Sequence, residues 1–193
     1  MINYQKAIKI INKVYLNLPN EKISISDSLN RVCAKNILSP STNPLANNTA
    51  FDGFAVLAKE TKGLSKKKNK KFKILKTIGA GDNPKINNYL KNSSVEIMTG
   101  GIIPKPFDSI IPVEKIKYYP AERNPTHIFI DSEVKKFSFI RFAGEDYNLK
   151  DVVVKKGELI QPKHIMALTT LGIKHLYVKK NPKIIFFGTG DEI

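Results

Sequence analysis

Four short segments of the chain place a glycine beside a carboxylate or hydroxyl group. Glycine lets backbone amides approach an anion closely, and carboxylate and hydroxyl oxygens are ligands that Mg²⁺ prefers. Such segments could hold a phosphate, an oxyanion or a magnesium ion, although each one alone also fits an ordinary turn or a solvated loop. They are residues 50–56 (Ala-Phe-Asp-Gly-Phe-Ala-Val), 97–101 (Ile-Met-Thr-Gly-Gly), 141–146 (Arg-Phe-Ala-Gly-Glu-Asp) and 188–192 (Gly-Thr-Gly-Asp-Glu).

The elements that must position these segments begin with a helix. Apolar residues at helical spacing predict a first helix over residues 4–18. A short strand at residues 23–25 and a second short helix capped by Ser26 are expected next. The Pro-, Asn- and Ser-rich stretch 39–49 is typical of an extended linker.

The middle of the chain has the pattern of a β domain. Short apolar or alternating segments are separated by Gly, Pro, Asn and Lys clusters, and no helical period persists. This spacing predicts a compact β-barrel or sandwich inserted into a mixed domain. The expected strands lie at residues 54–56, 72–74, 95–97, 110–113 and 128–130.

A mixed pattern resumes after Gly144. Strands are expected at residues 152–154, 159–160 and 175–178. Pro162 and Gly172 mark the first turn and the end of a helix between the last two of these strands.

Four consecutive apolar residues at 184–187 predict a strand buried on both faces, which is typical of a parallel sheet. Parallel strands need crossover connections and neighbouring strands, and the sequence stops soon afterwards. We therefore expect a piece of a longer protein, cut at the start of a third, α/β domain.

The expected fold is mixed α+β, with an elongated α/β domain interrupted by a β-barrel-like domain. The α/β domain comprises residues 1–46 and 142–180, and its first helix is expected to pack on the missing domain. The inserted β domain comprises residues 47–141, and residues 181–193 begin the truncated domain.

The formal net charge of +15 comes largely from lysine. Nine lysines and one glutamate lie between Lys59 and Lys76, a local excess of +8. Lysines in a loop without arginine, with Phe72 as the one aromatic residue among them, are a weak nucleic-acid signal, so we interpret this run as a solvated loop.

The composition also indicates where the chain works. With Cys33 as the single cysteine, no intrachain disulfide can form, which suits a reducing cytoplasm. Neither a secretory signal nor a membrane span is expected from the apolar pattern. His127, His164 and His175 lack zinc-ligand spacing with Cys33, and we expect Cys33 to pack in the core rather than act as a nucleophile.

Taken together, the four segments resemble the motifs of molybdopterin molybdotransferases, the family that includes the carboxy-terminal enzyme domain of gephyrin. Residues 49–56 resemble the family's Ser-Ala-Met-Asp-Gly-Tyr-Ala-Val signature. Residues 97–114 are similar to its Met-Thr-Gly-Ala segment and the acidic-apolar stretch that follows. Residues 141–146 and 189–193 are similar to its Arg-x-x-Gly-Glu-Asp and Thr-Gly-Asp-Glu-Leu motifs.

The chain departs from these motifs at several positions, none of which removes a carboxylate. Aromatic residues replace the usual Met and Tyr, and small or apolar residues stand where the family can have arginine, glycine or serine. The departures are Phe51, Phe54, Pro106, Phe107, Phe142, Ala143 and Gly188.

The resemblance implies a Mg²⁺-dependent transferase that inserts molybdate into adenylylated molybdopterin and releases AMP. It implies a homodimer with the active site between subunits, and a third, molybdopterin-binding domain without which we expect the chain to be inactive. The implied catalytic residues are Asp52, Thr99, Asp146 and Glu192, and the implied binding residues are Gly100, Gly101, Arg141, Glu145, Thr189, Gly190 and Asp191.

A division of labour is expected among the implied catalytic residues. Asp52 and Glu192 are expected to hold hydrated Mg²⁺ against a phosphate. Thr99 is expected to donate a hydrogen bond to a molybdate or phosphate oxygen, with the Gly100 and Gly101 amides nearby.

Asp146 is expected to orient Arg141 or a metal-bound water. Two rival functions stay open: a non-catalytic basic module that binds RNA or an acidic protein, and a dimerising scaffold without chemistry.

Overall fold

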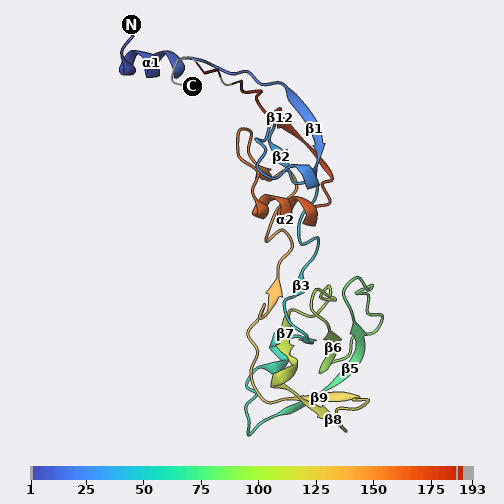
Figure 1. The fold of residues 1–193 in the computed structure, drawn as a ribbon. Helices are drawn as coiled ribbons and strands as arrows, with labels where there is room; N and C mark the ends of the chain where they lie inside the picture. Colours follow the sequence, from blue (N-terminus) through green and yellow to red (C-terminus); the bar gives the residue numbers. More distant parts are fainter. Residues whose placement is uncertain (1, 186, 189–193) are drawn as a thin grey trace. The chain divides into compact units, whose positions relative to one another are not determined.

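The chain divides into two compact units, one inserted into the other. The computed structural model describes residues 2–185, 187 and 188 (Figure 1). Unit 1 comprises residues 1–40 and 149–193, and unit 2 comprises residues 41–148. Unit 2 is larger at both ends than the β domain expected at 47–141, because Asn43 and Tyr147 exchange two backbone hydrogen bonds of 2.8 and 3.1 Å.

Unit 2 is built on a six-stranded curled sheet that forms a half-barrel with two open edges (Figure 1). Its strand order is β7-β4-β6-β5-β9-β8; β5 and β6 are parallel, and the other neighbours are antiparallel. Four of the five apolar segments predicted in this region lie wholly in one of these strands, and the fifth, 110–113, lies in β7 except for Val113. The strands are β4 (Gly53–Val56), β5 (Lys70–Ile78), β6 (Ser93–Ile97), β7 (Ser109–Pro112), β8 (Lys117–Tyr119) and β9 (His127–Ile130).

Strand β4 is covered on both faces, and this makes it the centre of unit 2. Phe54 and Val56 point into one hydrophobic cluster, whereas Ala55 points into another, as the alternation of a strand requires. All four residues of β4 are buried. Burying a side chain such as Phe54 stabilises the fold by roughly 1.5–3 kcal/mol, so the position of β4 is strongly specified.

Short pieces of regular structure replace two stretches that the sequence predicted to be irregular. The predicted linker 39–49 contains β3 (Asn48–Thr49), which pairs with β10 (Ile140–Arg141). The predicted lysine loop overlaps the 3₁₀ helix η2 (Ala58–Thr61) and contains most of β5. A further 3₁₀ helix, η3 (Val113–Lys115), follows β7.

Unit 1 combines two small antiparallel ladders with a helix. Strand β1 (Asn20–Ser24) pairs with β12 (His175–Lys179), and β2 (Ile37–Leu38) pairs with β11 (Val152–Val154). Helix α2 (Pro162–Thr170) begins at the predicted proline. The buried side chains that join these elements are Cys33, Val154, Ile160, Leu168, Leu176 and Val178.

The amino-terminal part of unit 1 is less helical than predicted. Helix α1 (Tyr4–Ile11) ends seven residues early, and none of its residues is buried among the described residues, so packing does not stabilise a longer helix. The predicted second helix is only the 3₁₀ turn η1 (Ile25–Asp27), capped by Ser24 rather than Ser26. Asn30 has a φ of 61°, which a right-handed helix cannot include.

Two predicted strands near the end of the chain are not found. Leu159 forms an isolated bridge with Val32 instead of a strand. Ile184, Ile185 and Phe187 belong to no strand and are exposed, because no neighbouring strand among the described residues covers them. Within the described part of the chain, no helix is long and apolar enough to cross a membrane.

We predict that Gly53→Ala destabilises unit 2 by about 2 kcal/mol or more, because the new Cβ would lie 2.3 Å from the backbone oxygen of Ile111. Urea unfolding followed by circular dichroism measures the change. The control is Gly79→Ala, whose Cβ would meet only the exposed side chain of Asp82, at 3.2 Å. Equal unfolding midpoints for the two variants would show that β4 tolerates a side chain at this position.

Candidate functional site

Asp52 and Thr99 meet at one end of the sheet in unit 2. Asp52 precedes β4 and Thr99 follows β6; because the two strands are antiparallel, with Gly53 opposite Ile97, these positions are adjacent. The backbone N–H of Thr99 donates to Asp52 Oδ1 at 2.6 Å, and its hydroxyl donates to the same oxygen at 2.7 Å. Two of the predicted catalytic residues are thus in direct contact.

The two hydrogen bonds keep the Asp52 carboxylate ionised. The Thr99 backbone N–H, and next the Thr99 hydroxyl, hold the pKa of Asp52 below its usual value because both donate to the charged form. The side chain is fully accessible to solvent, and Oδ2 accepts no hydrogen bond from the described residues. Asp52 therefore offers one open, negatively charged oxygen.

The Gly100 and Gly101 amides have a structural role. Gly100 N–H donates to the Thr49 carbonyl at 3.0 Å, and Gly101 N–H donates to the Met98 carbonyl at 2.8 Å. Neither hydrogen is available to an anion, which differs from the expected role of these amides. Glycine is needed at residue 101 because a Cβ there would lie 2.8 Å from the Ile97 side chain and 2.9 Å from the Met98 carbonyl oxygen.

Arg141 and Asp146 form the second pair of predicted site residues in unit 2. Arg141 Nη2 donates to both Asp146 oxygens, at 3.0 and 2.8 Å. Asn43 Nδ2 donates to Asp146 Oδ2 at 3.1 Å. Asp146 thus holds the Arg141 guanidinium, which is one of the two contacts that the sequence suggested for it.

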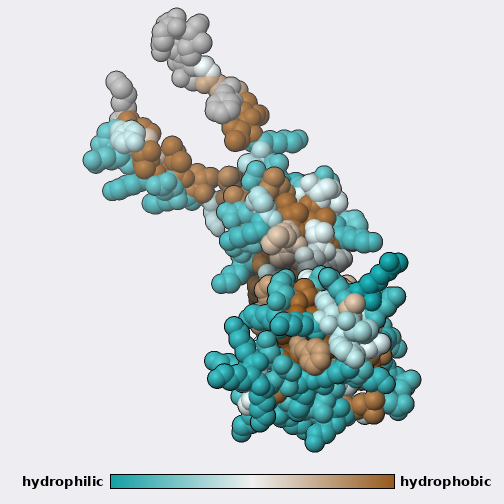
Figure 2. Space-filling view, turned by 90° about the horizontal axis from the view of Figure 1, so that it is seen from below, coloured by the Kyte–Doolittle hydropathy of each residue, from teal (hydrophilic) through white to brown (hydrophobic). Residues whose placement is uncertain are grey.

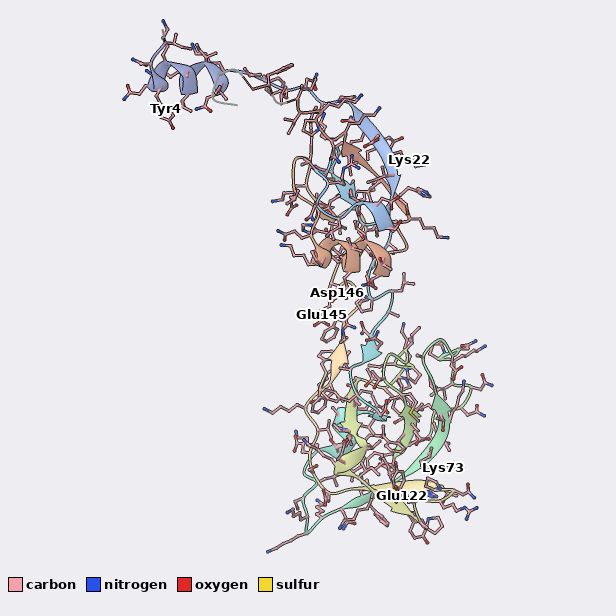
Figure 3. The ribbon with its side chains drawn as sticks, viewed as in Figure 1. Tyr4, Lys22, Lys73, Glu122, Glu145 and Asp146 are labelled. Atoms are coloured by element: carbon pink, nitrogen blue, oxygen red, sulfur yellow. The ribbon has the colours of Figure 1, made fainter. Side chains whose placement is uncertain are left out.

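Glu145 shapes the loop that carries Asp146 (Figure 3). Its Oε2 accepts the backbone N–H of Phe142 at 2.9 Å, and the neighbouring Ala143 N–H donates to Asn47 Oδ1, also at 2.9 Å. Asn47 and Asn43 anchor this loop, and sequence reasoning missed both, because asparagine in a presumed linker carries no distinguishing signal.

Strand β3 joins the two pairs. Thr49 N–H donates to the Gly101 carbonyl at 3.1 Å, while its own carbonyl accepts Gly100 N–H. On the other side, Thr49 pairs with Ile140 and Asn48 pairs with Arg141. Three of the four glycine-containing segments therefore meet around one strand. The fourth, with Thr189, Gly190, Asp191 and Glu192, lies outside the described residues.

A groove of about 660 Å³ opens beside β3 in unit 2. Its lining is mainly apolar, with a few charged and amide groups that could orient a ligand, as small-molecule sites commonly have. The sequence contained no signal for it. Representative lining residues are Asn47, Lys85, Ile102, Lys105, Asp108 and Ile140.

Asp52 is the residue of this site that could contribute a ligand to a largely hydrated Mg²⁺ ion. Among the described residues, no group of three or more His, Cys, Asp or Glu side chains could hold a metal ion. Mg²⁺ is commonly bound by one or two carboxylates, with water and substrate phosphates completing its shell. Asp52 Oδ2 can provide one such ligand.

Cys33 and the histidines take no part in this site. Cys33 is buried, and burial raises the pKa of its thiol, as expected for a core residue rather than a nucleophile. His164 Nε2 lies 3.4 Å from Glu158 Oε1 in unit 1.

Comparison with known proteins gives consistent matches along the chain. It is 29% identical over 192 residues to a molybdopterin molybdenumtransferase of Staphylococcus epidermidis, covering 100% of this chain and 44% of that protein. It is 30% identical over 194 residues to the Staphylococcus aureus protein of the same name, with the same coverage. The chain spans less than half the length of these relatives.

Solved structures match as well. The crystal structure of the molybdopterin biosynthesis MoeA protein from Pyrococcus horikoshii aligns with a TM-score of 0.81 and 26% identity, over 93% of this chain and 46% of that one. The family model described as the MoeA N-terminal region (domain I and II) matches residues 2–172. Because this match includes most of the sequence, the chain belongs to the MoeA N-terminal region family.

Proposed function

We propose that this chain forms part of an enzyme that inserts molybdate into adenylylated molybdopterin and releases AMP. Family membership and the name of the relatives, molybdopterin molybdenumtransferase, support the substrate class. The observation that carries the proposal is the Asp52–Thr99 contact, which presents an ionised carboxylate oxygen beside the meeting point of three motifs.

Asp52 is proposed to act as an anionic ligand and not as a proton donor. Its lowered pKa means that it is ionised at neutral pH, with Oδ1 held by Thr99 and Oδ2 directed to no described residue. Mg²⁺, when bound, neutralises the charge that develops on phosphate oxygens as a phosphoanhydride breaks. Asp52 would hold that ion, or one of its waters, at a defined position.

Arg141 is proposed to attract the oxyanion. One nitrogen, Nη2, binds Asp146, and the guanidinium carries further N–H groups that can donate to a molybdate or phosphate oxygen. Asp146 acts as a positioning residue for Arg141. Thr99 is proposed to orient Asp52, because its hydroxyl hydrogen is already donated there.

Residues beyond these are needed to complete the site. We propose that Glu192, with Thr189, Gly190 and Asp191, contributes to it, and that the site lies between the subunits of a cytoplasmic homodimer. We also propose that the completed site contacts the nucleotide and the pterin of the substrate.

We predict that Asp52→Asn lowers molybdate-dependent AMP release by about 10²–10³-fold in the complete gene product, because it removes a charge that stabilises the reacting phosphate. The assay follows AMP formed from adenylylated molybdopterin. Asp27→Asn, an exposed aspartate in η1 of unit 1, is the matched control and should retain full activity. Undiminished turnover by Asp52→Asn would exclude Asp52 from the chemistry.

We predict that Thr99→Val raises the pKa of Asp52 toward its ordinary value, while Thr99→Ser leaves it lowered. The valine variant loses the hydroxyl donor but keeps the backbone donor. The stabilisation due to the lowered pKa is present above the pKa of unfolded Asp52 and is lost as pH falls through the folded value, so in Thr99→Val this loss should be smaller and should be complete at a higher pH. Carboxyl ¹³C NMR titration measures the pKa; an unchanged value in Thr99→Val contradicts the assignment.

We predict that Asp146→Asn changes stability by less than about 1 kcal/mol but lowers activity at least tenfold. The Arg141–Asp146 pair is roughly two-fifths exposed, with side-chain accessibilities of 42% and 41%, and exposed ion pairs contribute little to folding. Thermal unfolding and AMP release are measured on the same preparation. Normal activity in this variant would show that the Arg141–Asp146 pair is only a surface contact.

A further inference from the structure

The outer face of strands β5, β9 and β8 carries a regular array of basic and aromatic side chains. Lys71 lies opposite Phe129, which lies opposite Lys117. Two residues along, Lys73 lies opposite His127, which lies opposite Tyr119. Cross-strand partners share a face, so these side chains form two parallel rows; we call them the basic-aromatic face.

The opposite face of the same strands packs into the hydrophobic core, so the basic-aromatic face points away from the core. Phe72, Ile128 and Ile130 alternate with the residues of the basic-aromatic face and are fully buried. By contrast, Lys73, Lys117 and Tyr119 are exposed, and Lys71, His127 and Phe129 are half-buried. The array is therefore a solvent-facing surface on a rigid sheet.

The three aromatic rings are mutually supported. Tyr119 packs edge-to-face against Phe129 at 5.8 Å and against His127 at 6.2 Å between ring centroids. Lys71 Nζ lies 3.3 Å from the centroid of the Tyr119 ring, so a cation covers this ring in the free protein. Burial, and then Lys71 and Lys73, hold the pKa of His127 below its usual value, so its ring is neutral at pH 7.

The charge around this face is mainly positive. The array contains three lysines and no acidic residue, and hydrophilic side chains cover most of the visible surface of unit 2 (Figure 2). Glu122, in the turn between β8 and β9, is one acidic residue at its border (Figure 3). Phe129 and Lys117 also line a groove of about 780 Å³, with Lys66, Lys115, Glu114 and Asp131, which extends the surface beyond the two rows.

The basic-aromatic face could not be predicted from the sequence. Lys71 and Lys73 belong to a lysine run whose one aromatic residue, Phe72, is buried in the core, and the rings of this face come from two later strands. Only the pairing of β5 with β9, and of β9 with β8, brings cation and ring together. The lysines of this face therefore have aromatic neighbours that the sequence did not predict.

We propose that the basic-aromatic face binds single-stranded nucleic acid. Unpaired bases stack on Tyr119 and on the exposed part of Phe129, and Lys71, Lys73 and Lys117 contact the phosphates. An arriving base displaces Lys71 from the Tyr119 ring and frees its ammonium group for a phosphate. Rows on a strand are about 6.8 Å apart, a spacing that an extended nucleotide backbone can follow.

Single-stranded nucleic acid differs from other anionic ligands because its binding would depend on the aromatic rings. An acidic peptide would be held by the lysines alone, and a duplex would bury its bases away from Tyr119. Single strands offer both an unpaired flat base and a phosphate charge. The surface is separate from the proposed transferase chemistry, so the two proposals can fail independently.

The test is fluorescence anisotropy with 5′-labelled 12-nucleotide oligouridine and oligothymidine, titrated with the 193-residue chain at several salt concentrations. Tyr119→Ala should weaken binding on the order of tenfold, because one stacked base is lost. Lys117→Gln should weaken binding of both oligomers and reduce the slope of log affinity against log salt by about 0.7.

Tyr177→Ala is the matched control. Tyr177 in unit 1 is 43% exposed, against 42% for Tyr119, and it too is covered by a lysine, with Lys35 Nζ at 4.3 Å. Its substitution should leave affinity unchanged, and circular dichroism checks that all variants fold. Equal losses in Tyr119→Ala and Tyr177→Ala, or displacement of the oligomers by polyglutamate at matched charge, would overturn the proposal.

Discussion

The backbone of one buried residue, Thr49, holds the candidate site together. Its N–H and carbonyl groups bind the Gly100–Gly101 turn on one side, and it pairs with Ile140 on the other. Its hydroxyl donates to the Phe51 carbonyl at 2.5 Å and shapes the turn that leads to Asp52. Since a buried backbone group without a partner is costly, these bonds constrain all three motifs at once.

The distribution of glycines and carboxylates around Thr49 follows from that constraint. Gly53 and Gly101 let neighbouring segments of the backbone approach more closely than a side chain would permit, so glycine is required at these positions for steric reasons. The carboxylate of Asp52 is held by the backbone N–H and hydroxyl of Thr99, and that of Asp146 is held by the side chains of Arg141 and Asn43. Such an arrangement gives fixed, exposed charges on a rigid base, which is what a site for a phosphate or an oxyanion needs.

The long strands of unit 2 were predictable because a buried strand leaves a run of apolar residues. Phe54–Val56 and Ile128–Ile130 are such runs. The two-residue strands β3 and β10 leave no periodic trace, so the residues that connect the motifs were missed. Helix α1 was overestimated because amphipathic spacing does not reveal whether a packing surface is present.

The site residues were predicted as motifs, but their contacts were not. Asp52 and Thr99 were chosen separately, and only the register of β4 against β6 shows that they touch. Likewise, the sequence analysis predicted that the Gly100 and Gly101 amides lie near a bound anion, although their hydrogens are donated to backbone carbonyl groups. Side-chain identity indicates the chemistry available, whereas pairing across strands decides which groups remain free.

The central claim is that the Asp52–Thr99 and Arg141–Asp146 pairs belong to one oxyanion site organised by Thr49. Molybdate can be located directly, by anomalous scattering at the molybdenum edge, in crystals of the complete gene product soaked with molybdate and AMP. The account predicts density for molybdate or the AMP phosphate in contact with both pairs. Ligand density remote from unit 2, with both pairs in contact only with solvent, would contradict it.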